Sequence, residues 1–166
     1  MRTEDFSIIK VGIADLKVAK GSDRLRTSGL GSCVGLVLYD SFKKTAGLAH
    51  IMLPLSALAK NGILNPAKYA DTAVEDLLKQ LKSAGVQING LKAKIAGGAQ
   101  MFLVHKENEM MRIGPRNVEA VKEMLLRYRI PLVAEDVGGS NGRTIEFDPV
   151  TGFLAVKTVN KGTKWI

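Results

Sequence analysis

The stretch that decides the fold is RTSGLGSCVGLVLYDSFKKTAGLAHIML, residues 26–53. It contains two apolar runs, Val34–Tyr39 and Ala46–Leu53, which are separated by the polar segment Asp40–Lys44. Two short apolar runs joined by a polar turn predict a β-hairpin or a closely spaced pair of strands. The rest of the chain is interpreted as support for this pair.

The same stretch holds Cys33, the only cysteine, and His50, one of two histidines. Adjacent strands lie about 5 Å apart, so a thiol at the start of one strand can touch an imidazole on the next. Such an imidazole lowers the pKa of the thiol and populates the nucleophilic thiolate. A lone cysteine in an apolar strand is also typical of a small buried hydrophobe, and a lone histidine of a structural residue. Spacing alone leaves both interpretations open.

The residues before Cys33 form a glycine-rich turn, Gly29-Leu30-Gly31-Ser32. Glycines allow a sharp turn and let a substrate approach backbone N–H groups, which could then act as an oxyanion hole. Thr27, just upstream, is by itself an ordinary β-branched strand residue.

Composition predicts a single soluble domain over residues 1–166. Hydrophobic residues make up 46% of the chain and charged residues 24%, and the length is sufficient for a real core. No apolar run is long enough to span a bilayer, and the N-terminal MRTEDFSIIK lacks the basic and apolar regions of a signal peptide. A single cysteine fits a reducing compartment. We therefore expect a cytoplasmic protein with no membrane insertion.

The net charge of +8 fits nucleic acid, an anionic membrane surface or an acidic protein partner. The basic residues are interleaved with acidic ones and no nucleic-acid-binding motif is present, so we expect no nucleic-acid partner. His105 lies in a charged segment and is predicted to be solvated. One cysteine and two distant histidines predict no metal site.

Periodicity predicts two helices. One helix is predicted to start with Asn65 as its N-cap and Pro66 at its first position, and Gly85 follows its end. The side chain of Tyr69 is expected to face outward or to lie at the edge of the packed face. Its apolar face is predicted to comprise Ala70, Ala73, Val74, Leu77, Leu78, Leu81 and Ala84. Asn117 is predicted to be the N-cap of the second helix. The segment Pro54–Asn65, which precedes the first helix, is predicted to be a loop.

Further strands are predicted from apolar runs and alternation, over Ser7–Ala19 (bulged at Gly12), residues 95–99, Leu132–Asp136, Arg143–Asp148 and Phe153–Val159. The last two form a predicted hairpin, and Lys161–Ile166 is predicted to be a frayed tail. The glycines at 97–98 fit either a cleft wall or tight packing. Those at 138–142 suggest a turn rather than an anion-binding loop. Many strands with two helices indicate the α+β class.

Several motifs together resemble the CheD family of bacterial chemotaxis proteins, over about Ile9–Val159. The motifs are TSGLGSCVGLVLYD, AGLAHIMLP, NPAKYADTAV, AGGAQMF, MRIGPRNVEAV and EDVGGSNGRTIEF. The resemblance implies stacked mixed β-sheets flanked by α-helices, in a single cysteine-hydrolase-like domain of the CheD type.

The resemblance also implies a function, the deamidation of chemoreceptor glutamines to glutamate with release of ammonia. It places the nucleophile at Cys33, the base at His50 and a third catalytic residue at Thr27, whose hydroxyl accepts a hydrogen bond from His50. Backbone N–H groups at Ser32 and Cys33 would stabilise the oxyanion, and no cofactor is needed. The implied substrates are the cytoplasmic helices of methyl-accepting chemoreceptors. The alternative is mainly an adaptor, because the family also binds and stimulates a CheC-type phosphatase.

Overall fold

A computed structural model describes residues 5–60, 62, 64–101 and 112–166 of the chain. The strands are β1 (Ile8–Lys10), β2 (Leu16–Lys20), β3 (Arg24–Leu30), β4 (Val34–Asp40), β5 (Thr45–Ile51), β6 (Lys92–Gly97), β7 (Leu132–Val137), β8 (Arg143–Phe147), β9 (Leu154–Thr158) and β10 (Gly162–Trp165). The α-helices are α1 (Ala70–Ser83) and α2 (Ile113–Arg127). Short 3-10 helices are η1 (Ser56–Leu58), η2 (Pro66–Lys68) and η3 (Ile88–Gly90).

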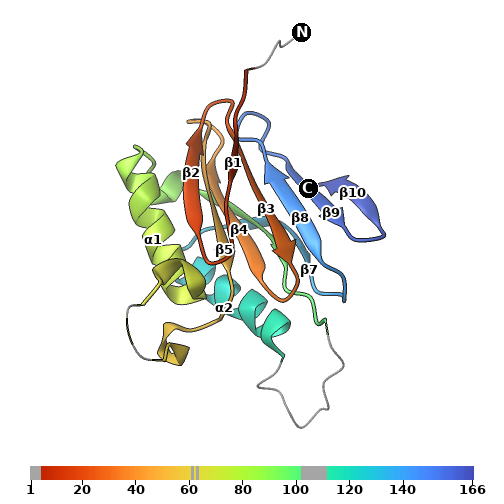
Figure 1. Ribbon diagram of the computed structural model, residues 1–166. Helices are drawn as coiled ribbons and strands as arrows, with labels where there is room; N and C mark the ends of the chain where they lie inside the picture. The colour runs from red at the N-terminus through yellow and green to blue at the C-terminus, as the bar shows by residue number, and fades with distance from the viewer. Residues whose placement is uncertain (1–4, 61, 63, 102–111) are drawn as a thin grey trace.

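The strands form two mixed five-stranded sheets that pack face to face. One sheet, called sheet A, has the order β1-β3-β8-β9-β10, and the other, sheet B, has the order β2-β5-β4-β6-β7. Both helices lie on the side of sheet B that faces away from sheet A (Figure 1). The α+β class with stacked mixed sheets and flanking helices is therefore confirmed.

The predicted hairpin is the centre of sheet B. β4 pairs with β5 in antiparallel register, and Asp40 closes the turn by accepting hydrogen bonds from the backbone N–H groups of Phe42 (2.9 Å) and Lys43 (3.0 Å). Every residue of both strands is buried, because sheet A covers one face and the helices cover the other. This double coverage explains why the two runs are continuously apolar instead of alternating.

Two hydrophobic cores hold the layers together, one on each face of sheet B. The first core lies between sheet B and the helices α1 and α2. Its residues include Leu36, Ile51, Leu77, Ile95, Val121 and Leu125. The core between the two sheets includes Leu25, Leu30, Val37, Leu48, Ile145, Phe147 and Val156. The hairpin contributes to both cores, so it is the part of the chain on which both layers depend.

The prediction of one strand over Ser7–Ala19 is wrong. The segment forms β1 in sheet A and β2 in sheet B, and the chain crosses between the sheets at residues 11–15. Ala14 adopts a positive φ of 56° in this crossing, and its N–H donates to the carbonyl of His50 (3.1 Å). A run of apolar residues carries the same pattern whether it stays in one sheet or changes sheets, so the pattern could not show the crossing.

The predicted starts of both helices are also wrong. Asn65 does cap through its side chain, which accepts from Ala67 N–H (3.1 Å), but it caps η2, and α1 begins only at Ala70. Of the two alternatives for Tyr69, the outward one is wrong, since Tyr69 is buried at 5% exposure, and its backbone forms a β-bridge with Leu53. In the second helix, Asn117 is not an N-cap, since α2 already begins at Ile113.

The C-terminal segment is a strand rather than a frayed tail. β10 pairs with β9 in antiparallel register from Gly162↔Thr158 to Trp165↔Ala155, so it extends sheet A at one edge. Lys94, which is buried in β6, donates to the main-chain oxygens of Gly152 (2.6 Å) and Ile166 (2.8 Å). The polar composition of β10 hid it from the sequence, because all four of its residues are exposed.

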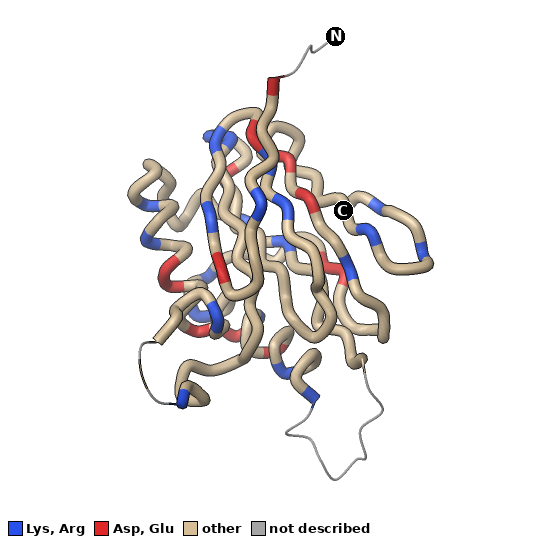
Figure 2. Tube along the Cα trace, in the orientation of Figure 1, with Lys and Arg blue, Asp and Glu red and all other residues tan. Residues whose placement is uncertain are grey.

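Charged residues are spread over the strands and helices that the structure describes. Figure 2 shows Lys and Arg on the helices, on both sheets and on the C-terminal hairpin, with Asp and Glu among them. Among the described residues, no helix is both long and apolar enough to cross a membrane.

Candidate active site

Cys33 lies in the short connection between β3 and β4, and backbone hydrogen bonds to residues 98–99 fix this connection. Gly98 N–H donates to the carbonyl of Cys33 and Ala99 N–H donates to the carbonyl of Gly31, both at 2.8 Å. The glycine pair at 97–98 thus packs directly against the cysteine turn. Cys33 itself is half-buried, so its thiol lies at the border between the interior and solvent.

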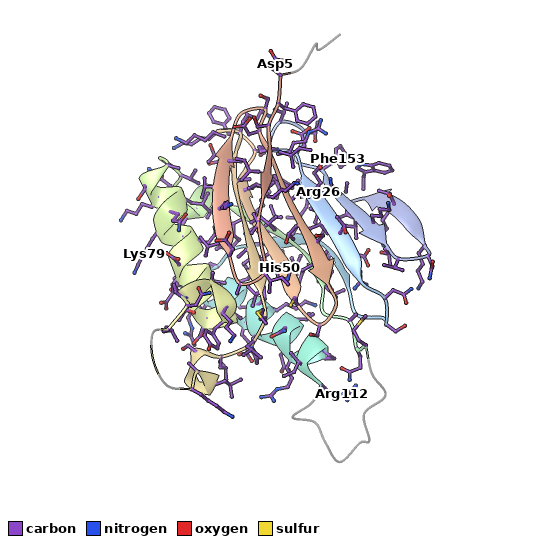
Figure 3. The ribbon with its side chains drawn as sticks, in the orientation of Figure 1. Asp5, Arg26, His50, Lys79, Arg112 and Phe153 are labelled. Atoms are coloured by element: carbon purple, nitrogen blue, oxygen red, sulfur yellow. The ribbon has the colours of Figure 1, made fainter. Side chains whose placement is uncertain are left out.

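His50 lies on β5 and is fully buried (Figure 3). It pairs with Gly35 of β4, and Cys33 lies two residues before Gly35. Side chains two residues apart in a strand point to the same face of the sheet. Cys33 packs against the core between the two sheets. Leu48, two residues before His50, belongs to the same core. The register therefore brings Cys33 and His50 to the same face of sheet B, as diagonal neighbours.

Thr27 reaches His50 from the opposing sheet. Its Oγ1 lies 2.7 Å from His50 Nδ1 and also 2.7 Å from the carbonyl oxygen of Val11, and Thr27 is itself buried. A hydroxyl has one hydrogen, which Thr27 donates to the Val11 carbonyl. The hydroxyl must then accept from His50, so the imidazole proton is on Nδ1 and the lone pair is on Nε2.

The missing side chain at Gly35 lets the two sheets approach at this point. A Cβ at Gly35 would lie 2.5 Å from Cδ1 of Ile145 and 3.1 Å from Cδ1 of Leu30, both in sheet A. Because Gly35 is directly opposite His50 in the β4–β5 ladder, the close approach occurs where Thr27 contacts the imidazole. Glycine at this position thus makes the contact between the two sheets possible.

Burial sets the protonation states of the two reactive groups. Desolvation lowers the pKa of His50 to about 4, so the imidazole is neutral at pH 7. Desolvation also raises the pKa of the Cys33 thiol above its ordinary value, although the backbone N–H of Cys33 opposes this change. The sequence-based expectation that the imidazole lowers the pKa of the thiol is therefore wrong for this state of the protein.

Three groups at the site form no hydrogen bond to another residue within the described part of the chain. His50 Nε2 is buried and has no partner there, so the thiol and the imidazole are not hydrogen-bonded to each other. The backbone N–H groups of Ser32 and Cys33 donate to no backbone carbonyl of a described residue. These three groups are the ones that an attacking thiol and a developing oxyanion need.

Asn117 is the residue at this site that sequence reasoning missed. It lies one turn into α2, is fully buried, and donates from Nδ2 to the carbonyls of Ser32 (3.0 Å) and Met52 (2.9 Å). These carbonyls belong to the residue before Cys33 and to the second residue after His50. Asn117 lies in the motif MRIGPRNVEAV, which could have indicated a role at the site. It was instead interpreted as the N-cap of the second helix.

Three further sequence predictions concern a metal site, His105 and the glycine-rich segment at 138–142. Within the described ranges, no three His, Cys, Asp or Glu side chains come together as metal ligands would. The prediction for His105 falls on residues outside the described ranges. Residues 138–142 connect β7 to β8 with a bend at residues 139–140, and Gly138 N–H donates to the carbonyl of Gly97 (3.0 Å).

Comparisons with known proteins give one consistent result. The family described as CheD chemotactic sensory transduction matches residues 52–158. A chemoreceptor glutamine deamidase CheD of Bacillus subtilis (strain 168) is 56% identical over 166 residues, which cover all of both chains. The protein of the same name from Halalkalibacterium halodurans is 60% identical over 159 residues, 96% of this chain and 98% of the relative. A probable chemoreceptor glutamine deamidase CheD of Clostridium botulinum is 51% identical over 98% of this chain and 99% of its own.

Proposed function

The chain belongs to the CheD family, and we propose that it deamidates glutamine side chains of chemoreceptors, with Cys33 as nucleophile, His50 as general base and acid, and Thr27 as the residue that orients His50. The activity follows from the relatives, which are named chemoreceptor glutamine deamidases. The residue roles are those that the resemblance implies, and the geometry of the site supports them. The enzyme is an amidohydrolase that acts on a protein side chain.

The observation that carries the residue roles is the contact between Thr27 and His50. Because the Thr27 hydroxyl accepts from Nδ1, the lone pair of the imidazole is on Nε2, the nitrogen without a partner in the described structure. A base that takes the thiol proton needs this tautomer. Thr27 supplies no negative charge to stabilise an imidazolium, so its contribution is to orientation and tautomer.

The first half of the reaction forms a thioester and releases ammonia. The thiol and the imidazole are both neutral at rest, so His50 Nε2 removes the proton from Cys33 Sγ as the sulfur attacks the carboxamide carbon of glutamine. The N–H groups of Ser32 and Cys33 stabilise the oxyanion of the tetrahedral intermediate. Nε2–H then protonates the departing nitrogen, which leaves as ammonia.

The second half hydrolyses the thioester. His50 Nε2 accepts a proton from water, and the resulting hydroxide attacks the thioester carbon through a second tetrahedral intermediate. The intermediate releases the thiolate of Cys33, which takes its proton back from Nε2–H. The product is glutamate, so each cycle exchanges a neutral amide on the substrate for a carboxylate, a potential methyl-accepting group.

The proposed substrates are the cytoplasmic helices of methyl-accepting chemoreceptors, and the proposed location of the protein is the cytoplasm. A net charge of +8 suits an acidic helical substrate, because opposite charges speed encounter. The same sign would also attract nucleic acid. We propose no such role, because acidic residues lie among the basic ones in both sheets and on the helices.

The proposal is tested on a folded cytoplasmic fragment of a chemoreceptor, incubated with the wild-type protein or with Cys33→Ala. Peptide mass spectrometry should show a gain of about 1 Da at defined glutamines with the wild type and none with Cys33→Ala. Circular dichroism of Cys33→Ala should match the wild type, since the substitution removes only a half-buried sulfur. A gain that persists with Cys33→Ala would rule out this nucleophile.

We further propose that the protein binds and stimulates a CheC-type phosphatase, as the resemblance implies. A Cys33→Ala protein that still raises phosphatase activity would separate the adaptor function from deamidation. Loss of both functions in the folded variant would indicate one shared surface. No stimulation by the wild type, with a phosphatase that is active alone, would refute the adaptor function.

A further inference from the structure

Asn117 holds the two halves of the site together from a helix. Its Nδ2 group has two hydrogens, and each one goes to a carbonyl of a different catalytic segment, that of Ser32 before Cys33 and that of Met52 after His50. Asn117 has no exposed surface, and its Oδ1 is buried without a partner among the described residues. An unsatisfied buried acceptor is destabilising, because it gives up its hydrogen bonds to water without replacement. An asparagine at this buried position is therefore explained by the two hydrogen bonds that its amide group donates, and not by packing in the core.

The hydrogen bond to Ser32 also fixes the direction of the neighbouring N–H group. The carbonyl of Ser32 and the N–H of Cys33 belong to one peptide unit, which is planar and trans. In such a unit the C=O and N–H bonds point in opposite directions. Once Asn117 holds the carbonyl from one side, the N–H of Cys33 points to the other side, where it donates to no described backbone carbonyl.

The helix that carries Asn117 is itself fixed against this turn. A Cβ at Gly114 would overlap the carbonyl oxygens of Gly98 and Ala99, so the first turn of α2 rests directly on that backbone. The N–H groups of these same two residues hold the cysteine turn at Cys33 and Gly31. The turn before Cys33 is thus held both by the backbone N–H groups of residues 98–99 and by the Asn117 amide.

We propose that Asn117 is a positioning residue that orients the Cys33 N–H as an oxyanion donor. The inference rests on the proposed function in that it assumes acyl chemistry at Cys33. Without Asn117 the peptide unit between Ser32 and Cys33 can rotate, and the N–H no longer points to a fixed place. Acyl transfer, which passes through an oxyanion, should then slow more than a reaction of the same thiol that forms none.

Two reagents separate these reactions at one sulfur. With p-nitrophenyl acetate, Sγ attacks the ester carbonyl, a tetrahedral oxyanion forms, and p-nitrophenolate leaves as the thioester forms. With iodoacetamide, Sγ displaces iodide at a saturated carbon and no oxyanion forms. Both products are counted on Cys33 by intact mass. The ratio of the two rates does not depend on whether glutamine is the natural substrate. Circular dichroism and urea denaturation establish that each variant is folded under the assay conditions, because an unfolded fraction would expose the thiol to iodoacetamide.

The variant is Asn117→Leu, which has a similar shape but no donor. The matched control is Val121→Ala, which removes packing from the same face of α2 and is also fully buried. Losing one oxyanion donor costs about 100- to 1,000-fold, so misorientation of one donor is expected to lower the acylation rate of Asn117→Leu by about 10- to 100-fold. Alkylation should stay within about threefold of the wild type, and Val121→Ala should keep the wild-type ratio.

Equal losses in both rates for Asn117→Leu, or the same change of ratio in Val121→Ala, would overturn the proposal. If Asn117→Leu does not fold, Asn117→Ala is measured by the same ratio. The receptor assay of the wild type decides the proposed function separately. A wild type that is acylated in an Asn117-dependent manner but releases no ammonia from receptors keeps the oxyanion assignment and refutes the substrate.

Discussion

The orientation of His50 depends on a single hydroxyl group, which leads to a prediction at the scale of one residue. Thr27→Val keeps the shape of the side chain but leaves His50 Nδ1 and the Val11 carbonyl without their partner. A hydrogen bond of about 1–3 kcal/mol corresponds to a fall in kcat of about 5- to 150-fold. Thr27→Ser is the control and should retain most of the activity, since it keeps the hydroxyl. Steady-state ammonia release measures both variants, and full activity of Thr27→Val would contradict the orienting role.

The protonation state of Cys33 gives a second prediction at this scale. Burial raises the pKa of the thiol above its ordinary value of 9.0, so the free protein should react slowly with iodoacetamide at pH 7. The alkylation rate should rise with pH and reach its midpoint above about pH 9. A rate that is already at its plateau between pH 6 and 8 would instead show a preformed pair of thiolate and imidazolium. Cys33→Ser reports the background.

The sequence pointed to Cys33, His50 and Thr27 as candidate site residues but not to their protonation states. Cys33 and His50 were found because each is rare in the chain, and Thr27 because of a motif. Their pKa directions depend on burial by a second sheet, which a pattern within one strand does not contain. Asn117 was missed for a similar reason. Its two acceptors, Ser32 and Met52, are 85 and 65 residues away along the chain.

At the scale of elements, the site depends on how closely β4 approaches β8. Gly35→Ala would place a Cβ about 2.5 Å from Ile145 Cδ1, so the buried Ile145 side chain would have to move in the core beside His50 and Thr27. Overpacking of this kind costs about 1–3 kcal/mol of unfolding free energy, and deamidation should fall as Thr27 moves away from the imidazole. Urea denaturation and ammonia release measure the two effects.

The matched test of this contact is the double variant Gly35→Ala with Ile145→Val. The second substitution removes Cδ1, the atom that would clash, and alone costs about 0.5–1.5 kcal/mol. The double variant should be more stable than the sum of the two losses predicts, and it should regain activity. If the losses of unfolding free energy from the two single substitutions simply add in the double variant, then the Cβ introduced by Gly35→Ala does not clash with Ile145 Cδ1.

The elements that the sequence predicted well are those whose pattern is set locally. The hairpin of β4 and β5, the strands β6 to β9 and the apolar face of α1 follow from runs and periodicity. The change of sheet between β1 and β2 and the pairing of β10 depend on partners distant in sequence. An edge strand with four exposed residues has no apolar pattern from which it could be predicted.

For the whole molecule, the buried imidazole links stability to pH. The pKa of His50 is about 4 in the folded protein and about 6.5 when exposed, so the unfolded chain binds more protons between these values. Stability should therefore fall as the pH decreases from 6.5 toward 4. Between pH 7.5 and pH 5 this histidine should account for about 2 kcal/mol of the loss.

Urea denaturation of the wild type and of His50→Gln at pH 7.5 and pH 5 measures this contribution. Carboxyl groups titrate in both proteins and lower both unfolding free energies on acidification. The difference between the two losses of unfolding free energy is therefore the contribution of His50. The wild type should lose more unfolding free energy than His50→Gln on acidification. Equal losses would mean that the imidazole is not held neutral by burial.

The most direct test of the account is to trap the covalent intermediate. The wild-type protein and a folded chemoreceptor fragment are mixed, quenched in acid within one turnover, and weighed intact. Covalent catalysis by Cys33 predicts a species equal to the sum of the two masses minus about 17 Da for ammonia. Hydroxylamine should cleave this species, and Cys33→Ala should not form it. Conversion of glutamine to glutamate at the wild-type rate by Cys33→Ala, with no such species in either protein, would contradict the account.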